Sequence, residues 1–168
     1  MTEETHEKIV QTVLGNIPPT QLGSTMTHEH LIIDFSMMLR EPRDLNHVEM
    51  MDAPVTMENL GWISQYCYSN KDNLLVTDEQ TAIAECIQYK KLGGGTIVDA
   101  TTIGIGRNPK ALARISKASS VNIVMGAGYY VDAAQPSTVN ELTEDQIAEQ
   151  IYLEITQGID ESGIKAGI

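Results

Sequence analysis

The spacing of hydrophobic and polar residues changes several times along this chain, and each change marks a boundary between expected elements. Residues 9–24 form a short β-rich leader in which apolar positions flank a turn-forming run at residues 15–19. We expect a small hairpin there that caps one end of a domain. Residues 25–33 favour extended structure and contain no breaking residue before Asp34, which predicts the first strand of a sheet.

The segment that follows shows no sustained period. Residues 34–60 contain two prolines and scattered methionines, so we expect a long irregular loop. A loop of this length is uncommon in a compact domain unless it has a task such as lining a site. Residues 60–68 predict a short helix.

Helical and strand-like patterns alternate regularly from residue 77 onward. Residues 77–80, with the sequence Thr-Asp-Glu-Gln, are typical of a capping box that opens a helix. Apolar residues recur at roughly helical spacing after it, and the glycines at 93–95 are expected to end the helix. Residues 96–102 then predict a strand.

A second helix and a third strand come next. Asn108 is a favourable N-cap and Pro109 suits the first helical position, so a helix is expected to begin there. Leu112 and Ile115 are placed on its buried face. Residues 121–125 predict the next strand.

The last part of the chain repeats this unit. Residues 143–146 form another capping box, which opens a helix that closes near Gly158. Its apolar positions recur at i, i+4 and i+8. They are Ile147, Ile151 and Ile155. Residues 164–168 predict the start of a fourth strand.

Strands that alternate with helices imply an α/β fold with a parallel sheet. Two architectures of this kind compete, the open doubly wound sheet and the closed (β/α)8 barrel. The first strand is not followed by the GxGxxG pattern of dinucleotide-binding sheets. Gly104 and Gly106 follow the second strand without the third glycine, and we interpret them as a turn.

Composition adds limits on the class of protein rather than on its chemistry. The 168 residues suffice for a single compact domain, and 42% hydrophobic with 20% charged residues is ordinary for a globular chain. The formal net charge of -12 argues against nucleic acid or an anionic membrane surface as a partner, since both require a basic patch. No apolar run approaches the length of a membrane span. We therefore expect neither nucleic acid nor a membrane as a partner.

The N-terminal residues and the two cysteines indicate a cellular compartment. Residues 1–8 are polar and acidic, so we expect a flexible N-terminus that is not a signal peptide. Cys67 and Cys86 form neither a CxxC pair nor a disulfide framework, which fits a reducing environment. The expected location is the cytosol.

His28-Glu29-His30 is the strongest functional signal in the sequence. Side chains on a strand alternate between faces, so both imidazoles should face one side and Glu29 the other. Two such imidazoles can bind one borderline metal such as zinc. The alternative is a pair of histidines satisfied by backbone hydrogen bonds. The position favours the metal, because barrel active sites gather at the C-terminal ends of strands.

Other polar residues lie on the later strands. Asp99, in the middle of the second strand, is expected to be a buried polar residue bonded to a neighbouring strand rather than a metal ligand. Thr101 and Thr102 close that strand, where they could touch substrate or a metal ligand. Tyr129 and Tyr130 cap the third strand. Each could line a pocket or pack against the helical layer, and the sequence leaves both alternatives open.

Residues 25–31, with the sequence TMTHEHL, closely resemble the strand-1 motif of the phosphotriesterase family within the amidohydrolase superfamily. The motif with its context is specific, whereas HxH alone is not. The resemblance extends from about residue 9 to residue 168. Further matching segments are residues 10–15, 93–95, 101–105, 126–132 and 164–168.

The resemblance implies a (β/α)8 barrel with two divalent metal ions, usually zinc. In the family, the strand-1 histidines bind the more buried metal, a strand-4 carboxylate bridges the metals, and strands 5, 6 and 8 supply two histidines and an aspartate. By that pattern His28 and His30 are metal ligands, and Tyr130 matches a substrate-pocket position. The metals would activate a bridging hydroxide and polarise the scissile carbonyl or phosphoryl group.

The chain also departs from the family pattern. The bridging carboxylate would fall just after Ile168, and Lys165 comes too early in the strand-4 motif to replace it. A barrel needs about 250 residues. We therefore expect residues 1–168 to form a single incomplete domain, the N-terminal half of a TIM barrel with about strands 1–4, built from the leader at 9–24 and the β/α units at 25–168. The catalytic residues are then expected beyond Ile168.

Two hypotheses about function follow from these observations. The first is a metal-dependent hydrolase of the phosphotriesterase-related type that cleaves a small acyl amide, similar to N-acetyltaurine, or an ester, with this chain inactive alone. The second is a non-catalytic truncated product that binds a partner or is unstable. A third interpretation, an open flavodoxin-like sheet, fits the His28-Glu29-His30 run poorly, because such a sheet needs a phosphate-binding turn after the first strand.

Overall fold

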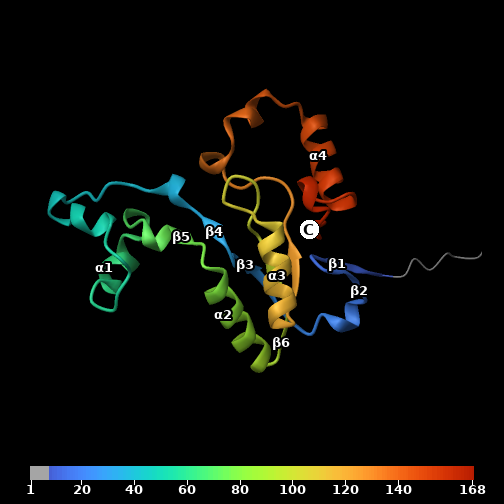
Figure 1. Cartoon of the computed structure of the whole chain (residues 1–168). Coiled ribbons are helices and arrows are strands. Elements are labelled where there is room, and N and C mark those ends of the chain that lie inside the picture. The colour runs from blue at the N-terminus through green and yellow to red at the C-terminus, as the bar shows by residue number, and fades with distance from the viewer. Residues whose placement is uncertain (1–7) are drawn as a thin grey trace, which may run out of the picture.

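A computed structural model describes residues 8–168 and shows a three-stranded parallel sheet with helices packed on it (Figure 1). The strands are β3 (Ser24–Glu29), β6 (Gly94–Asp99) and β7 (Asn122–Met125), in the order β3-β6-β7. Both pairings are parallel. The predicted α/β class with a parallel sheet is therefore confirmed. A flexible N-terminus was predicted for residues 1–8. Residues 1–7 of that range lie outside the part of the chain that the structure describes.

Two helices cover one face of the sheet, and a third lies near the C-terminus (Figure 1). They are α2 (Glu79–Lys91), α3 (Pro109–Ser119) and α4 (Glu144–Thr156). The predicted buried residues of the second helix, Leu112 and Ile115, are 1% and 0% exposed. They pack in one core with Ile97 and Ile123 from the strands. The predicted face of the last helix is less buried, and Ile155 remains 37% exposed.

The leader forms the expected hairpin. Strands β1 (Val10–Thr12) and β2 (Gly15–Ile17) pair antiparallel. The Val13 N–H donates to the Ile123 carbonyl at 2.9 Å, and the Gln11 side chain donates to the carbonyls of Ile155 and Ala166 at 2.9 and 2.5 Å. These bonds attach the hairpin to β7 and to the C-terminal segment, which lies beside it in Figure 1.

The long segment after β3 projects away from the sheet and is largely irregular, as predicted (Figure 1). It contains α1 (Leu60–Gln65) and a small antiparallel pair, β4 (Ile33–Asp34) with β5 (Leu75–Val76). The fully buried Asn70 side chain donates to the carbonyls of Met50 and Ala53 at 2.7 and 2.8 Å, so side-chain bonds replace regular secondary structure there. The 3₁₀ helices of the described chain are Pro19–Gln21, Ser36–Met38, Leu45–Met51, Cys67–Ser69, Asp72–Leu74, Asp132–Ala134, Ser137–Glu141 and Asp160–Ser162.

Two predicted strand boundaries were wrong. The first strand ends at Glu29 instead of residue 33, because the Leu31 N–H donates to the Asp99 carboxylate instead of a neighbouring strand. The second begins at Gly94 and ends at Asp99. Gly95 lies within this strand at a point where the neighbouring backbone approaches closely, which requires glycine. A Cβ at that position would lie 2.2 Å from the Leu22 carbonyl oxygen.

One of the two predicted capping boxes was also wrong. Helix α2 begins one residue later than expected, with Asp78 as its N-cap. The Asp78 carboxylate accepts from the N–H groups of Gln80 and Thr81 and leaves Thr77 outside the helix. The second box is confirmed, because Thr143 and Gln146 satisfy each other's backbone N–H groups at the start of α4.

Residues 164–168 do not form a regular strand, contrary to prediction, but they run beside β7. The Gly167 N–H donates to the Met125 carbonyl at 2.9 Å, and the Ala127 N–H donates to the Ile168 carbonyl at 2.7 Å. Two bonds are too few for a ladder. Over residues 8–168, no helix has the length and apolar character needed to cross a membrane.

Candidate functional site

The two histidines of the HxH run converge at the end of β3. Their Nε2 atoms lie 3.3 Å apart, and the ring centroids are separated by 5.2 Å. His28 is exposed and His30 is half-buried. Glu29 instead lines a hollow with Met26 and Cys86, beside α2. The predicted alternation of these three side chains is therefore confirmed.

The spacing of the two ring nitrogens fits a metal site. Zinc binds imidazole nitrogen at about 2.0–2.1 Å in tetrahedral geometry, so two adjacent ligands are separated by about 3.3 Å. The observed separation of the Nε2 atoms is 3.3 Å. Within residues 8–168, however, no cluster of three or more His, Cys, Asp or Glu side chains is placed to hold a metal. The described chain thus offers two imidazole donors at the end of one strand and no further ligand beside them.

His30 is held from its other ring nitrogen by the strand next to it. Its Nδ1 lies 3.0 Å from the Thr101 hydroxyl oxygen, just past the end of β6. Thr102, the neighbouring residue, has its methyl group near Gly126, and its buried hydroxyl has no hydrogen-bond partner in the part of the chain that the structure describes. Of the two threonines expected near a metal ligand, only Thr101 contacts a histidine.

A buried carboxylate lies beneath this contact. Asp99, the last residue of β6, is fully buried and accepts from the N–H groups of Leu31 and Thr101 at 2.8 and 3.0 Å. The expectation of a buried polar residue is confirmed. Its bonds, however, reach Leu31 just past β3 rather than a residue of a neighbouring strand, and Asp99 ends β6 instead of lying in its middle.

Burial changes the acidity of both groups. Burial raises the pKa of Asp99 above its ordinary value, although the two backbone N–H groups oppose the change. Burial also lowers the pKa of His30, and the nearby Asp99 carboxylate opposes this only in part. The lowered pKa of His30 favours the neutral imidazole, which is the form that binds metals.

Aromatic rings border the histidine pair on one side. The Tyr130 ring lies edge-on to His30 with centroids 5.9 Å apart, and Phe35 lies 5.8 Å from Tyr130. Tyr129 instead donates its hydroxyl to Gln150 of α4 at 2.6 Å, so it packs against the helical layer. The sequence reasoning missed Phe35. Its one available signal was that it is the only phenylalanine of the chain and follows His30 by five residues.

A second polar cluster, also missed, joins the loops after β6 and β7 to α4. Arg107 makes a bidentate ion pair with Glu154, with both N···O distances 2.7 Å and both side chains less than 10% exposed. Arg107 also donates to the Gly126 carbonyl, and the Gly128 N–H donates to Glu154 at 3.2 Å. These bonds fix the start of the loop that carries Tyr130.

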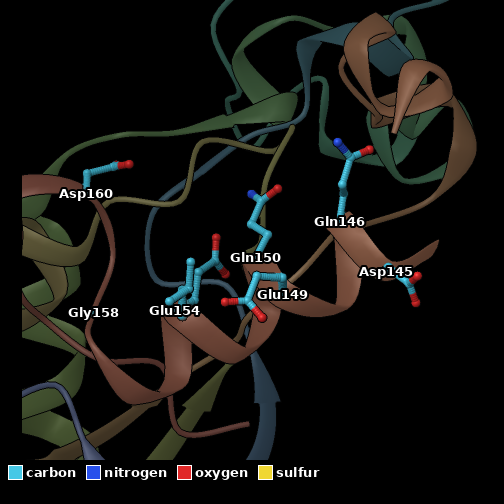
Figure 2. A pocket seen from close by; sticks show the side chains of 8 residues that line it. Asp145, Gln146, Glu149, Gln150, Glu154, Gly158 and Asp160 are labelled. Carbon is cyan, nitrogen blue, oxygen red and sulfur yellow. The ribbon is translucent and has the colours of Figure 1, made fainter. Parts of the chain in front are cut away.

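Glu154 also borders the hollow shown in Figure 2, which lies over α4 and the segment after it. Its lining is mostly acidic and amide side chains. They are Asp145, Gln146, Glu149, Gln150, Leu153, Glu154, Gly158 and Asp160. This lining includes neither histidine of the HxH run, so the hollow is separate from the candidate metal centre.

Comparison with known proteins extends over nearly the whole chain. Residues 8–168 match the sequence profile described as "Phosphotriesterase family". An N-acetyltaurine hydrolase of Xenopus tropicalis is 46% identical over 160 residues, which are 95% of this chain and 46% of that protein. The chain therefore spans about half the length of the curated relatives it matches.

Solved structures agree with this match. A resiniferatoxin-binding protein from Rhodobacter sphaeroides is 39% identical and superposes with a TM-score of 0.93 over 95% of this chain and 45% of that one. An organophosphorus hydrolase from Deinococcus radiodurans is 27% identical, with a TM-score of 0.64 over 98% of this chain and 43% of its own. From the profile match over residues 8–168 and these relatives, the chain belongs to the phosphotriesterase family.

Proposed function

We propose that this chain supplies the first β/α units of a metal-dependent hydrolase with a (β/α)8 barrel, in which His28 and His30 are the first two metal ligands. In this proposal β3, β6 and β7 are the first three barrel strands, and residues 164–168, which bond to the edge of β7, lie at the place of the fourth. The observation that carries the proposal is the 3.3 Å separation of the two Nε2 atoms at the C-terminal end of a parallel strand.

The complete subunit is proposed to hold two zinc ions, with the remaining ligands supplied by the portion that corresponds to the rest of the relatives' length. When bound, such ions would supply Lewis-acid activation of water and of a scissile carbonyl. His28 and His30 would hold a metal through the Nε2 atoms that converge, and Thr101 contacts the other ring nitrogen of His30. Tyr130 and Phe35 border the site and would pack against the substrate.

The proposed substrate is a small acyl amide similar to N-acetyltaurine, or an ester, hydrolysed in the cytosol. Support for the amide comes from the 46% identity to a protein named for N-acetyltaurine hydrolysis. The similar enzyme from Deinococcus radiodurans is instead named for the hydrolysis of organophosphorus compounds. Activity assays must therefore decide which type of bond is cleaved.

Zinc binding by the purified chain tests the metal site. We expect less than one tightly bound zinc per chain, because two imidazoles alone bind metal weakly, and we expect binding to disappear in the double variant His28→Ala/His30→Ala. His47→Ala is the matched control, because His47 lies in a separate 3₁₀ segment against Trp62. Zinc uptake unchanged by removal of both histidines, measured by competition with a chromogenic chelator, would overturn the assignment.

A second candidate function has one observation in its favour. Because residues 8–168 contain no third ligand near the histidine pair, the chain by itself fits a non-catalytic product that binds a partner or is unstable. Incubation of the purified chain with N-acetyltaurine and zinc, followed by detection of released taurine, tests this second candidate. Turnover that depends on His28 and His30 would exclude the non-catalytic product, whereas both candidate functions expect no turnover from this chain alone.

A further inference from the structure

The contact between His30 and Thr101 decides which nitrogen of the imidazole is free. A neutral imidazole carries its proton on either Nδ1 or Nε2, and the partner of one nitrogen selects the form. Here Nδ1 lies 3.0 Å from the Thr101 hydroxyl oxygen, while Nε2 faces His28. If Nδ1–H donates to that oxygen, the lone pair of Nε2 points toward the place where the two histidines converge.

Thr101 is in turn fixed by the carboxylate of Asp99. The Thr101 N–H donates to one carboxylate oxygen, and the Leu31 N–H, directly after His30, donates to the other. One side chain therefore holds the backbone on both sides of the contact between ring and hydroxyl. The bonds form a closed circuit from His30 through Leu31, Asp99 and Thr101 back to the His30 ring.

The circuit replaces a sheet that stops pairing at this point. The register between β3 and β6 shifts between Met26 and Glu29, and the last ladder bond runs from the Ala100 N–H to the Glu29 carbonyl. Beyond it the Leu31 N–H is buried and would lack a partner without Asp99. The local geometry of His30 is thus set by a side chain 69 residues away in sequence, rather than by continued strand pairing.

An acid at this position carries an energetic cost. Asp99 is fully buried, and over residues 8–168 its carboxylate takes part in no ion pair. Burying a carboxylate without a cation is unfavourable even when it is hydrogen-bonded. Two oxygens that both accept are what the two N–H groups require, because an amide side chain offers only one acceptor.

We propose that Asp99 and Thr101 are positioning residues that hold His30 in the Nδ1–H form, with Nε2 free for a divalent metal. The inference rests on the proposed metal-ligand role of His30, but it makes a separate statement about the metal-free protein. In that state His30 is already in the binding form, so metal binding does not have to change its tautomer. Residues that orient metal-ligating histidines in this way typically contribute about 10–100-fold to metal affinity.

The first measurement is the tautomer of His30 in the metal-free chain, read from the 15N shifts of its ring by two-dimensional NMR. We expect Nδ1–H in the wild type and in Thr101→Ser, which keeps the hydroxyl, and loss of this preference in Thr101→Val. Thr102→Val is the matched control, because the same substitution next to Thr101 removes a hydroxyl that bonds to no described residue. Nε2–H in the wild type would overturn the proposal.

The second measurement is the affinity for Co²⁺, used as a spectroscopic substitute for zinc. Thr101→Val and Asp99→Asn should each weaken binding by about 10–100-fold, and Thr101→Ser and Thr102→Val should leave it unchanged. The two ideas can fail separately. If the wild type binds no Co²⁺ but His30 holds the Nδ1–H form, only the metal site is contradicted. If Thr101→Val changes neither the Co²⁺ affinity nor the His30 tautomer, only the positioning role is contradicted.

Discussion

Two buried carboxylates, Asp99 and Glu154, lie beside the ends of neighbouring parallel strands and both accept hydrogen bonds from backbone N–H groups of loops. They differ in what else they contact. Glu154 has a bidentate partner in the buried Arg107, while Asp99 has no cationic partner within residues 8–168. Their pKa values move in opposite directions, raised for Asp99 by burial and lowered for Glu154, where hydrogen bonds from Arg107 and Gly128 outweigh burial.

The difference indicates two roles. The contact of Glu154 with Arg107 is a structural bond that stabilises the fold, and the contacts of Asp99 are positioning bonds that orient His30. The Arg107–Glu154 pair joins two loops to a helix, and its two charges neutralise each other inside the protein. Asp99 gives up hydration without a compensating cation, and its bonds lead to His30 rather than to another element of the scaffold. Removing the first should therefore reduce mainly stability, whereas removing the second should reduce mainly the order of the metal site.

The largest effect is expected for Arg107→Ala. It leaves Glu154 buried without its cation, and breaking a buried pair in this way destabilises proteins by about 3–5 kcal/mol. Urea unfolding followed by circular dichroism measures the loss. Arg114→Ala is the control, because Arg114 makes the same bidentate contact to Glu79 on the surface, where such pairs contribute little.

The paired variant Arg107→Met/Glu154→Gln sharpens this prediction. It removes both charges and keeps an acceptor for the Gly128 N–H, so it should be more stable than Arg107→Ala alone. If Arg107→Ala were no more destabilising than Arg114→Ala, the Arg107–Glu154 pair would not be the structural bond that the comparison requires.

The same pair predicts how stability depends on pH. Because the folded pKa of Glu154 lies below its unfolded value of 4.5, its contribution is full above that value and is lost as the pH falls through the folded pKa. The unfolding free energy of the wild type should exceed that of Glu154→Gln at pH 7, and the gap should narrow under acid conditions. A gap that stays constant from pH 7 to pH 3 would contradict the lowered pKa.

A smaller loss of stability is expected for Asp99→Asn. The amide oxygen can accept from only one of the N–H groups of Leu31 and Thr101, and a buried donor left unsatisfied costs about 1–3 kcal/mol. Removal of the buried charge offsets part of this loss. The comparison with Glu154 predicts that Asp99→Asn is less destabilising than Arg107→Ala in urea, and the reverse order would break it.

Local sequence predicted the parts of the fold that depend on neighbours in the chain. The hairpin of the leader, the N-cap at Asn108 and the apolar face of α3 all follow from residues a few positions apart. The convergence of His28 and His30 followed from strand alternation alone. These features were predictable because their periods and caps are set by backbone geometry.

Contacts between distant residues account for what was missed. The first strand was predicted too long because nothing near Leu31 shows that Asp99 will bind its N–H. Arg107 and Glu154 are 47 residues apart, and neither has a local pattern that marks it as buried. The same holds for the candidate site, where the histidines were found from their motif but Thr101 could be paired with His30 only in three dimensions.

The smallest expected effect concerns two threonines in similar local sequences. Thr77 and Thr143 both precede a Glu/Asp pair and a glutamine, yet only Thr143 is an N-cap that accepts the Gln146 N–H. Thr143→Ala should cost about 1 kcal/mol, and Thr77→Ala should stay within about 0.5 kcal/mol, as is usual on the surface. Unfolding in urea measures both variants on one scale. Equal losses would mean that the local motif sets the contribution of a side chain to stability, whatever partner that side chain contacts. The distinction between Asp99 and Glu154, which rests on their partners, would then lose its basis.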